Sequence, residues 1–187
     1  CEFSGVVRDA FKKLGHEAWS CDIVQSETPG LHFICDVSRI LGSVKWDMVL
    51  AFPPCTHLCV SGARWFKDKT EEQRAAIDFF MMFANCNAPK VCIENPVGIM
   101  STRWRKPDQI IQPWQFGHPE SKSTCLWLKG LPKLQPTNVL SLPESGRWNN
   151  QTPSGQNKLG PSPERAKNRS RTYEGIAMAM AEQWGTE

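Results

Sequence analysis

Residues 50–59 read LAFPPCTHLC, and they decide how the rest of the chain is interpreted. They follow WDMV at residues 46–49, an apolar run typical of a buried strand, which must end at the two prolines. Cys55 stands directly after Pro53 and Pro54, at the carboxyl end of the predicted strand. Ligands bind at that edge in open α/β sheets, so the stretch predicts a thiol placed for chemistry. The alternative is a small buried cysteine without a chemical role.

A second stretch repeats this plan. Residues 91–96 read VCIENP, again a short apolar strand followed by a polar pair and a proline. If the two strands are neighbours, Cys55 and Glu94 face one crevice. A thiol beside a carboxyl group is the combination that covalent catalysis with an acid partner requires.

The order of the predicted elements indicates an α/β fold. Apolar residues at helical spacing predict helices over 6–14, 70–83 and 175–184, and short apolar runs predict strands at 18–21, 32–37 and 123–128. A capping box at residues 70–73 is expected to open the second helix, and Gly15 to end the first. Such alternation favours a mostly parallel sheet with helices on both faces. Because few residues precede Gly5, we expect the first strand to be truncated. Nine of the fourteen prolines follow residue 100, which predicts a loop-rich C-terminal half.

The first turn and two acidic residues suggest a nucleotide-like ligand. Gly5 precedes a predicted helix, whose first N–H groups and partial positive charge suit a phosphate or carboxylate. Asp22 follows the predicted strand at 18–21, where an acidic side chain can accept hydrogen bonds from ribose hydroxyls, and Asp36 is a second acid at the end of the stretch 32–37. The alternative for both acids is a helix cap or a turn.

Composition narrows the class of protein. The 187 residues, 40% hydrophobic and 22% charged, suffice for one domain with a core. No apolar run approaches the ~18 residues of a membrane span and no signal-peptide pattern is present, so a cytoplasmic protein with reduced thiols is expected. No second ligand pair accompanies the CTHLC segment at residues 55–59, so no metal is predicted. Residues 101–187 carry 12 Lys and Arg against 7 Asp and Glu, which is compatible with an acidic polymer.

These motifs resemble those of the DNA cytosine-5 methyltransferases, most closely the short members encoded by bacteriophages and prophages, some of which belong to restriction–modification systems. The likeness rests on FSG at residues 3–5, Asp22, Asp36, PPC at 53–55 and ENP at 94–96, in the family's order, and extends to 108–118 and 169–173. It implies a Rossmann-like methyltransferase sheet that binds S-adenosyl-L-methionine. The implied cofactor residues are Phe3, Gly5, Asp22, Asp36 and Pro53.

The resemblance also implies a reaction and a substrate. Cys55 would attack C6 of cytosine while Glu94 binds the N3 and 4-amino edge, and C5 would then receive the methyl group. The base would be flipped out of double-stranded DNA, since C5 cannot be reached within the duplex. The implied substrate contacts are Pro54, Asn95, Arg169 and Arg171. We expect a monomer in the cytoplasm of a bacterial host.

The chain departs from the family in three places. Val7 replaces the second glycine of the first motif. No Gln-Arg-Arg motif is present, and ESKST at residues 120–124 stands in its place, so Lys122 is expected to contact the cytosine carbonyl oxygen unless it is simply solvated. Residues 129–168 are a short, loop-rich insertion where larger relatives have a target-recognition domain, between a catalytic core at 1–128 and a C-terminal helix within 169–187. Sequence specificity is therefore expected to be short or weak.

Two other functions remain open at this point. A pyrimidine mononucleotide could be the methyl acceptor, because thymidylate-synthase-like enzymes also use a Pro-Cys nucleophile. Alternatively, the chain could be an inactive DNA-binding protein of the same fold.

Overall fold

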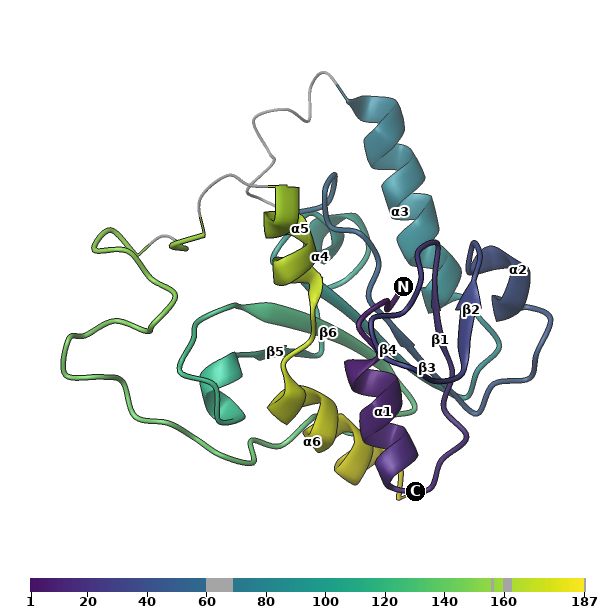
Figure 1. Ribbon diagram of the computed structural model, residues 1–187. Helices are drawn as coiled ribbons and strands as arrows, with labels where there is room; N and C mark the ends of the chain where they lie inside the picture. Colours follow the sequence, from purple (N-terminus) through teal and green to yellow (C-terminus); the bar gives the residue numbers. More distant parts are fainter. Residues whose placement is uncertain (60–68, 156, 160–162, 187) are drawn as a thin grey trace.

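A computed structural model describes residues 1–59, 69–155, 157–159 and 163–186 (Figure 1). It confirms a mixed α/β fold. The elements in chain order are α1 (Val6–Lys13), β1 (Ser20–Asp22), β2 (His32–Ile34), α2 (Ser38–Leu41), β3 (Met48–Ala51), α3 (Thr70–Ala84), β4 (Lys90–Pro96), α4 (Met100–Arg103), β5 (Gln109–Ile111), the 3₁₀ helix η2 (Pro113–Gln115), β6 (Thr124–Lys129), α5 (Pro163–Ser170) and α6 (Glu174–Trp184). No helix among the described residues is long and apolar enough to cross a membrane.

The larger sheet has four strands in the order β3-β4-β6-β5. β3 and β4 are parallel, with Leu50 opposite Cys92, whereas β6 runs antiparallel to both β4 and β5. The prediction of a mostly parallel sheet is therefore wrong for its second half. Parallel neighbours need a long crossover, usually a helix, and only the four-residue α4 and the three-residue η2 connect β4, β5 and β6.

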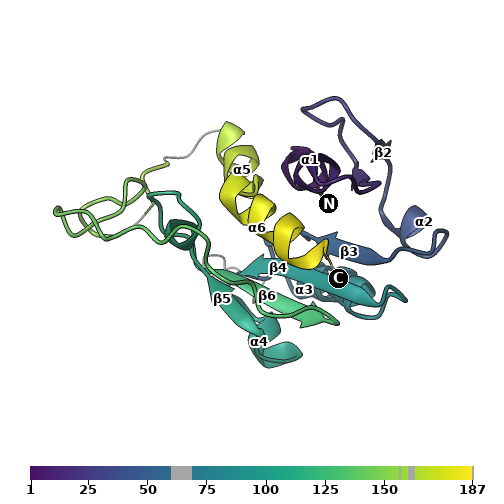
Figure 2. The same ribbon diagram turned by 90° about the horizontal axis from the view of Figure 1, so that it is seen from below.

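Helices cover both faces of this sheet, as predicted (Figure 2). Side chains alternate between the faces along each strand, so Cys92 and Leu126 pack with α1 and α6, whereas Ile93 and Trp127 pack with α3. Trp127 is 1% exposed, and its indole meets the ring of Phe80 edge-to-face at 5.2 Å. Because both faces of the sheet are packed against helices, the ends of its strands have fixed positions.

β1 and β2 form a separate, parallel two-stranded sheet. The residues before α1 run beside it, where the Glu2 N–H donates to the Cys21 carbonyl at 2.9 Å. The helix predicted from Gly5 to Gly15 is confirmed. Gly5 has φ 77° before the first helical residue and Gly15 has φ 88° after the last, and both values suit glycine.

The predicted capping box of α3 is wrong, and α5 is an additional helix. α3 already begins at Thr70, so Lys69 occupies the cap position and no side chain there makes a capping hydrogen bond. The interval 129–168, predicted to be a loop-rich insertion, also contains the first part of α5. Before α5 the segment is anchored to the core: the Leu140 N–H donates to the Trp114 carbonyl at 2.9 Å, and Trp148 stacks on Trp114.

Candidate active site

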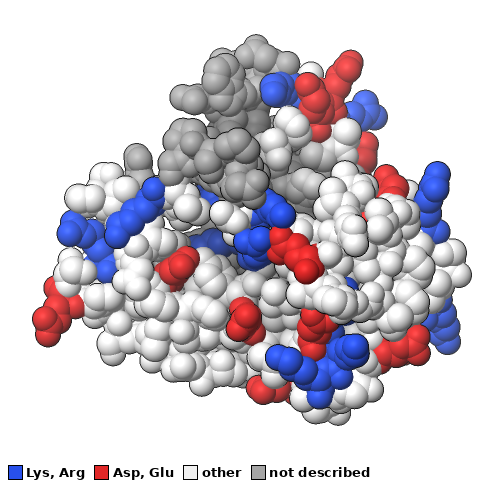
Figure 3. Space-filling view, in the orientation of Figure 1, with Lys and Arg blue, Asp and Glu red and all other residues white. Residues whose placement is uncertain are grey.

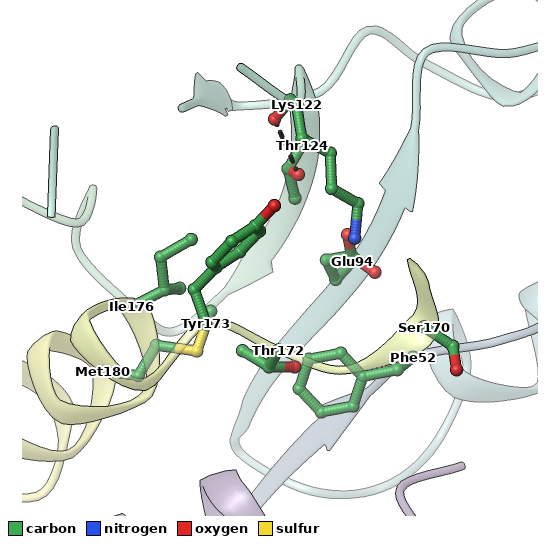
Figure 4. A pocket seen from close by; sticks show the side chains of 9 residues that line it. All are labelled: Phe52, Glu94, Lys122, Thr124, Ser170, Thr172, Tyr173, Ile176 and Met180. Carbon is green, nitrogen blue, oxygen red and sulfur yellow. Dashed lines mark hydrogen bonds between the residues drawn. The ribbon is translucent and has the colours of Figure 1, made fainter. Parts of the chain in front are cut away.

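A small pocket opens where β3 and β4 end and β6 begins, at what we call the pocket edge (Figure 4). Because β6 is antiparallel to β4, its first residue, Thr124, lies opposite Pro96, the last residue of β4. Lys122 and Glu94 therefore line the same pocket although 28 residues separate them along the chain. The pocket is lined by Phe52, Glu94, Lys122, Thr124, Ser170, Thr172, Tyr173, Ile176 and Met180.

The loop that carries Cys55 is fixed to the end of β4. The Asn95 side chain is 1% exposed and its Nδ2 donates to the Pro53 carbonyl at 2.8 Å. Asn95 Oδ1 is buried and has no hydrogen-bond partner among the described residues. Asn95, predicted to bind substrate, thus supports the loop that precedes Cys55, while Pro53 is buried and Pro54 exposed.

Cys55 begins a tight turn. The N–H groups of Leu58 and Cys59 both donate to the Cys55 carbonyl at 3.0 Å, and the Ile99 N–H donates to the Leu58 carbonyl at 2.8 Å. Any side chain at residue 98 would collide with that same carbonyl, so Gly98 permits the turn to lie against the chain that follows β4. Cys55 is half-buried as a result.

Cys55, Glu94 and Lys122 lie close enough to act on one another electrostatically. Hydrogen bonding to Cys59 and burial raise the pKa of the Cys55 thiol, Glu94 raises it further, and Lys122 lowers it. Burial also raises the pKa of Glu94, against the opposing charge of Lys122. The structure therefore brings together the three residues predicted to be catalytic, although Cys55 lies beside the pocket lining and not within it.

The segment at residues 169–173, which we call the C-terminal segment, holds Lys122 at the pocket. Lys122 Nζ donates to the Arg169 carbonyl at 3.0 Å and lies 6.0 Å from the centre of the Tyr173 ring. In Figure 4 its amine points toward Glu94. Arg169 was predicted to bind substrate through its side chain, which is exposed, and the structure adds a second contribution from its backbone.

Arg171, also predicted to bind substrate, makes a two-pronged, partly exposed ion pair with Glu27. Its guanidinium donates to both carboxylate oxygens of Glu27, at 2.8 and 2.6 Å, and to Asn168 at 2.8 Å. Lys167 approaches the same carboxylate at 3.0 Å. These hydrogen bonds lower the pKa of Glu27 to about 2. Arg171 thus ties the C-terminal segment to the loop between β1 and β2.

The residues predicted to bind a cofactor, apart from Pro53, gather at the carboxyl ends of β1 and β2, which we call the turn edge. The Glu27 N–H donates to the Phe3 carbonyl at 2.8 Å, and the Cys35 N–H to the Asp22 carbonyl at 3.0 Å. Both acids also make local turns: Asp22 Oδ1 accepts from the Val24 N–H at 3.3 Å, and Asp36 Oδ1 from the Ser38 N–H at 2.8 Å. These contacts are the ones expected from the alternative interpretation, in which Asp22 and Asp36 are turn or helix-cap residues.

Arg8 is a structural residue of the turn edge that the sequence reasoning missed. Its side chain is fully buried and donates to Asp9, Ser20, Ser26, the Thr28 hydroxyl and carbonyl, and the Pro29 carbonyl. Thr28 and Arg8 fill the space where a Cβ on Gly5 would stand. An arginine beside Val7 and Phe11, on the buried side of α1, is the signal that could have revealed it.

The turn edge offers a donor set that fits a nucleoside. Asp22 Oδ2 makes no hydrogen bond within the described residues, so it can accept one from a ribose hydroxyl. The start of α1, after Gly5, supplies backbone N–H groups to a carboxylate. Asp36 is exposed beside Asp22. An acidic acceptor and backbone N–H groups at one edge are among the groups that the cofactor implied by the resemblance would need.

The pocket contains residues without a predicted role, notably Tyr173, Thr172 and Met180. The sequence marked residues 169–173 as part of the family likeness but gave no reason to place Tyr173 beside Glu94. Within the described parts of the chain, no group of three or more His, Cys, Asp or Glu side chains is arranged to hold a metal ion. Comparisons with protein-family models, curated proteins and solved structures found no match.

Proposed function

We propose that this protein transfers a methyl group from S-adenosyl-L-methionine to C5 of cytosine in DNA. The observation that carries the proposal is the convergence of Cys55, Glu94 and Lys122 at the pocket edge, from three separate segments. A nucleophile, an acid and a cation are the groups that activation of a pyrimidine ring requires.

Each residue has a defined task in this reaction. The Cys55 thiolate adds to C6, and Glu94 in its acid form protonates N3, so that electron density rises at C5. S-adenosyl-L-methionine, when bound, supplies the methyl group that C5 receives. After loss of the C5 proton to a base, the C6–sulfur bond breaks, Cys55 leaves as thiolate, and N3 returns its proton to Glu94.

The charges at the pocket edge support this division of tasks. Burial raises the pKa of Glu94, which favours the protonated acid that N3 needs. The thiol of Cys55 is held protonated by Cys59, burial and Glu94, so it needs help to ionise. Lys122 lowers the pKa of Cys55 and is therefore the group that favours the thiolate, besides its proposed contact with the cytosine carbonyl oxygen.

The size of the pocket indicates how substrate must enter. Its volume is about 20 Å³, room for roughly one water molecule. A cytosine flipped from a duplex would therefore have to displace part of the wall. Ser170, Thr172 and Tyr173, from the end of α5 and the link to α6, form a part of that wall that lies outside the sheet.

Charge around the pocket is compatible with a nucleic acid. Lys and Arg side chains gather beside the hollow in the middle of the face shown in Figure 3, with acidic side chains next to them. Lys167 and Arg171 are paired with Glu27, whereas the side chain of Arg169 is exposed. Arg169 is thus the better candidate for a phosphate contact.

The decisive experiment follows labelled methyl groups into duplex DNA and, in a parallel reaction, into deoxycytidine monophosphate. We expect label at C5 of cytosine in DNA, and Cys55→Ala should reduce the rate by at least about 10⁴-fold because no C6 adduct can form. Cys86→Ser, which changes a half-buried cysteine just beyond α3, is the matched control and should retain activity. Absence of label in the native protein while a control enzyme is active would refute the proposal, and label only in the mononucleotide would redirect it.

A further inference from the structure

Tyr173 is the chain's one tyrosine, and it joins three groups at the pocket edge. Its hydroxyl donates to Glu120 Oε2 at 2.5 Å, its ring lies 6.0 Å from Lys122 Nζ, and it lines the pocket with Glu94. Figure 4 shows the side chain extending from the C-terminal segment toward Lys122 and Thr124. Burial and the bond to Glu120 raise the pKa of its phenol, which therefore stays neutral and keeps its proton for Glu120.

The ring is fixed from more than one side. The ring of His118 lies 5.0 Å from that of Tyr173, and His118 Nε2 accepts a hydrogen bond from the Gly175 N–H at 2.9 Å. Glu120 holds the hydroxyl end. Because the ring is already held in place, contact with a cation causes little further loss of conformational entropy.

Lys122 gains its orientation from this arrangement. An ammonium group has three N–H donors on a flexible stem, and at this site one donor reaches the Arg169 carbonyl. Within the described parts of the chain the other two bond to no acceptor, so they can face a ligand. The negative face of the Tyr173 ring attracts the ammonium from the side and restricts the directions the stem can take.

We propose that Tyr173, held by Glu120, is a positioning residue that aims the Lys122 ammonium into the pocket. The inference rests on the proposed function and gives the C-terminal segment a part in it. The Lys122 ammonium would thereby point in a fixed direction. A lysine without such a contact has a flexible stem, whereas the guanidinium of arginine is a rigid planar fork.

The first test is a double-mutant cycle on methyl transfer to duplex DNA. Tyr173→Leu should lower kcat about tenfold and leave the KM for the cofactor unchanged, whereas Tyr173→Phe, which keeps the ring, should lower kcat less than about threefold. In a Lys122→Met background, Tyr173→Leu should change kcat by less than about twofold, because the group that it positions is gone. Equal losses in both backgrounds would overturn the inference.

The second test needs no turnover. Replacing the single tyrosine by 3-fluorotyrosine gives one ¹⁹F resonance, which reports residue 173 alone. Lys122→Met should shift this resonance, and Lys129→Met, at the far end of β6, should not. An unchanged resonance in Lys122→Met refutes the contact. A shifted resonance in a protein that methylates nothing retains the contact and rejects the proposed function.

Tyr173→Leu could also unfold the chain, so Glu120→Gln serves as a second variant. It keeps the length of residue 120 but weakens the bond to the Tyr173 hydroxyl. The fluorinated phenol should then titrate at lower pH, and kcat should fall by about twofold to fivefold with normal thermal unfolding. An unchanged titration together with an unchanged kcat would show that the bond from Tyr173 to Glu120 does not position Lys122.

Discussion

The pocket edge and the turn edge both carry acidic side chains at the ends of parallel strands, but they use them differently. At the pocket edge, Glu94 is enclosed with Lys122 and Cys55, and burial raises its pKa. At the turn edge, Asp36 is exposed and accepts a hydrogen bond from its own turn, which lowers its pKa. The comparison teaches that a strand end alone does not indicate chemistry. Enclosure of opposed charges is the more specific sign.

Glu94→Gln is expected to have the largest effect, and it tests whether the enclosed acid of the pocket edge takes part in the reaction. We expect methyl transfer to fall about 10³-fold, because an amide cannot protonate N3. Measurement of single turnovers at saturating cofactor and DNA isolates this step, and the exposed Glu144→Gln is the control. A Gln variant within threefold of the native rate would show that the acid at residue 94 is unnecessary.

The same substitution should affect stability in the opposite direction. The folded-state pKa of Glu94 lies above its usual 4.5, so ionisation of this carboxyl costs stability as the pH rises from about 4.5 through the raised value. Glu94→Gln removes that penalty. Its melting temperature relative to the native protein should therefore increase as the pH rises from 4 to 8.

At the turn edge the largest expected effect belongs to Arg8. Arg8→Met would leave the carbonyls of Thr28 and Pro29 without their donor and Asp9 without its ion pair, so we expect a loss of about 3 kcal/mol in the free energy of unfolding. Urea unfolding measures it. Arg39→Met, on the exposed side of α2, should change stability by less than about 0.5 kcal/mol. A loss below about 1 kcal/mol for Arg8→Met would mean that the loop is held by other contacts.

The sequence predicted much of the pocket edge, because the main signals for that edge are local. The apolar runs before Cys55 and before Glu94 each indicate a strand and its end, and β3 and β4 are neighbours as the hypothesis required. Lys122 could be placed only by analogy. Its position depends on the antiparallel pairing of β6 with β4, a long-range contact that leaves no mark in local periodicity.

Other parts of the site were invisible for different physical reasons. Tyr173 lies between α5 and α6, where no period assigns a side chain to a face. The buried Arg8 contradicts the usual exposure of arginine and is accommodated only because a distant loop supplies its acceptors. Arg171 was predicted to contact the substrate, and the sequence does not show that Glu27, 144 residues earlier, pairs with it.

A smaller effect is expected at Asp22 and Asp36, whose substitutions should have different consequences. Asp22→Asn should weaken binding of S-adenosylhomocysteine about tenfold, since it removes a charged acceptor for a ribose hydroxyl. Asp36→Asn should mainly weaken the start of α2, by about 0.5–1 kcal/mol. Calorimetric titration with S-adenosylhomocysteine, the demethylated product of the cofactor, gives the affinities without turnover. Equal affinity of Asp22→Asn and the native protein would remove Asp22 from the cofactor site.

A comparably small effect is expected at Glu27, which joins the two edges through Arg171 and Lys167. The pairs are partly exposed, so solvent screening limits the loss in Glu27→Gln to about 1 kcal/mol at pH 7. The pKa of Glu27 is lowered from 4.5 to about 2, so the stabilisation is complete above about pH 4.5 and disappears as the pH falls toward 2. Urea unfolding of the native protein and Glu27→Gln should therefore differ at pH 7 and converge near pH 2. If the difference persists there, the carboxylate does not supply it, and the C-terminal segment is held over the pocket by its other contacts, of which the bond from Lys122 to the Arg169 carbonyl is the nearest to Glu94.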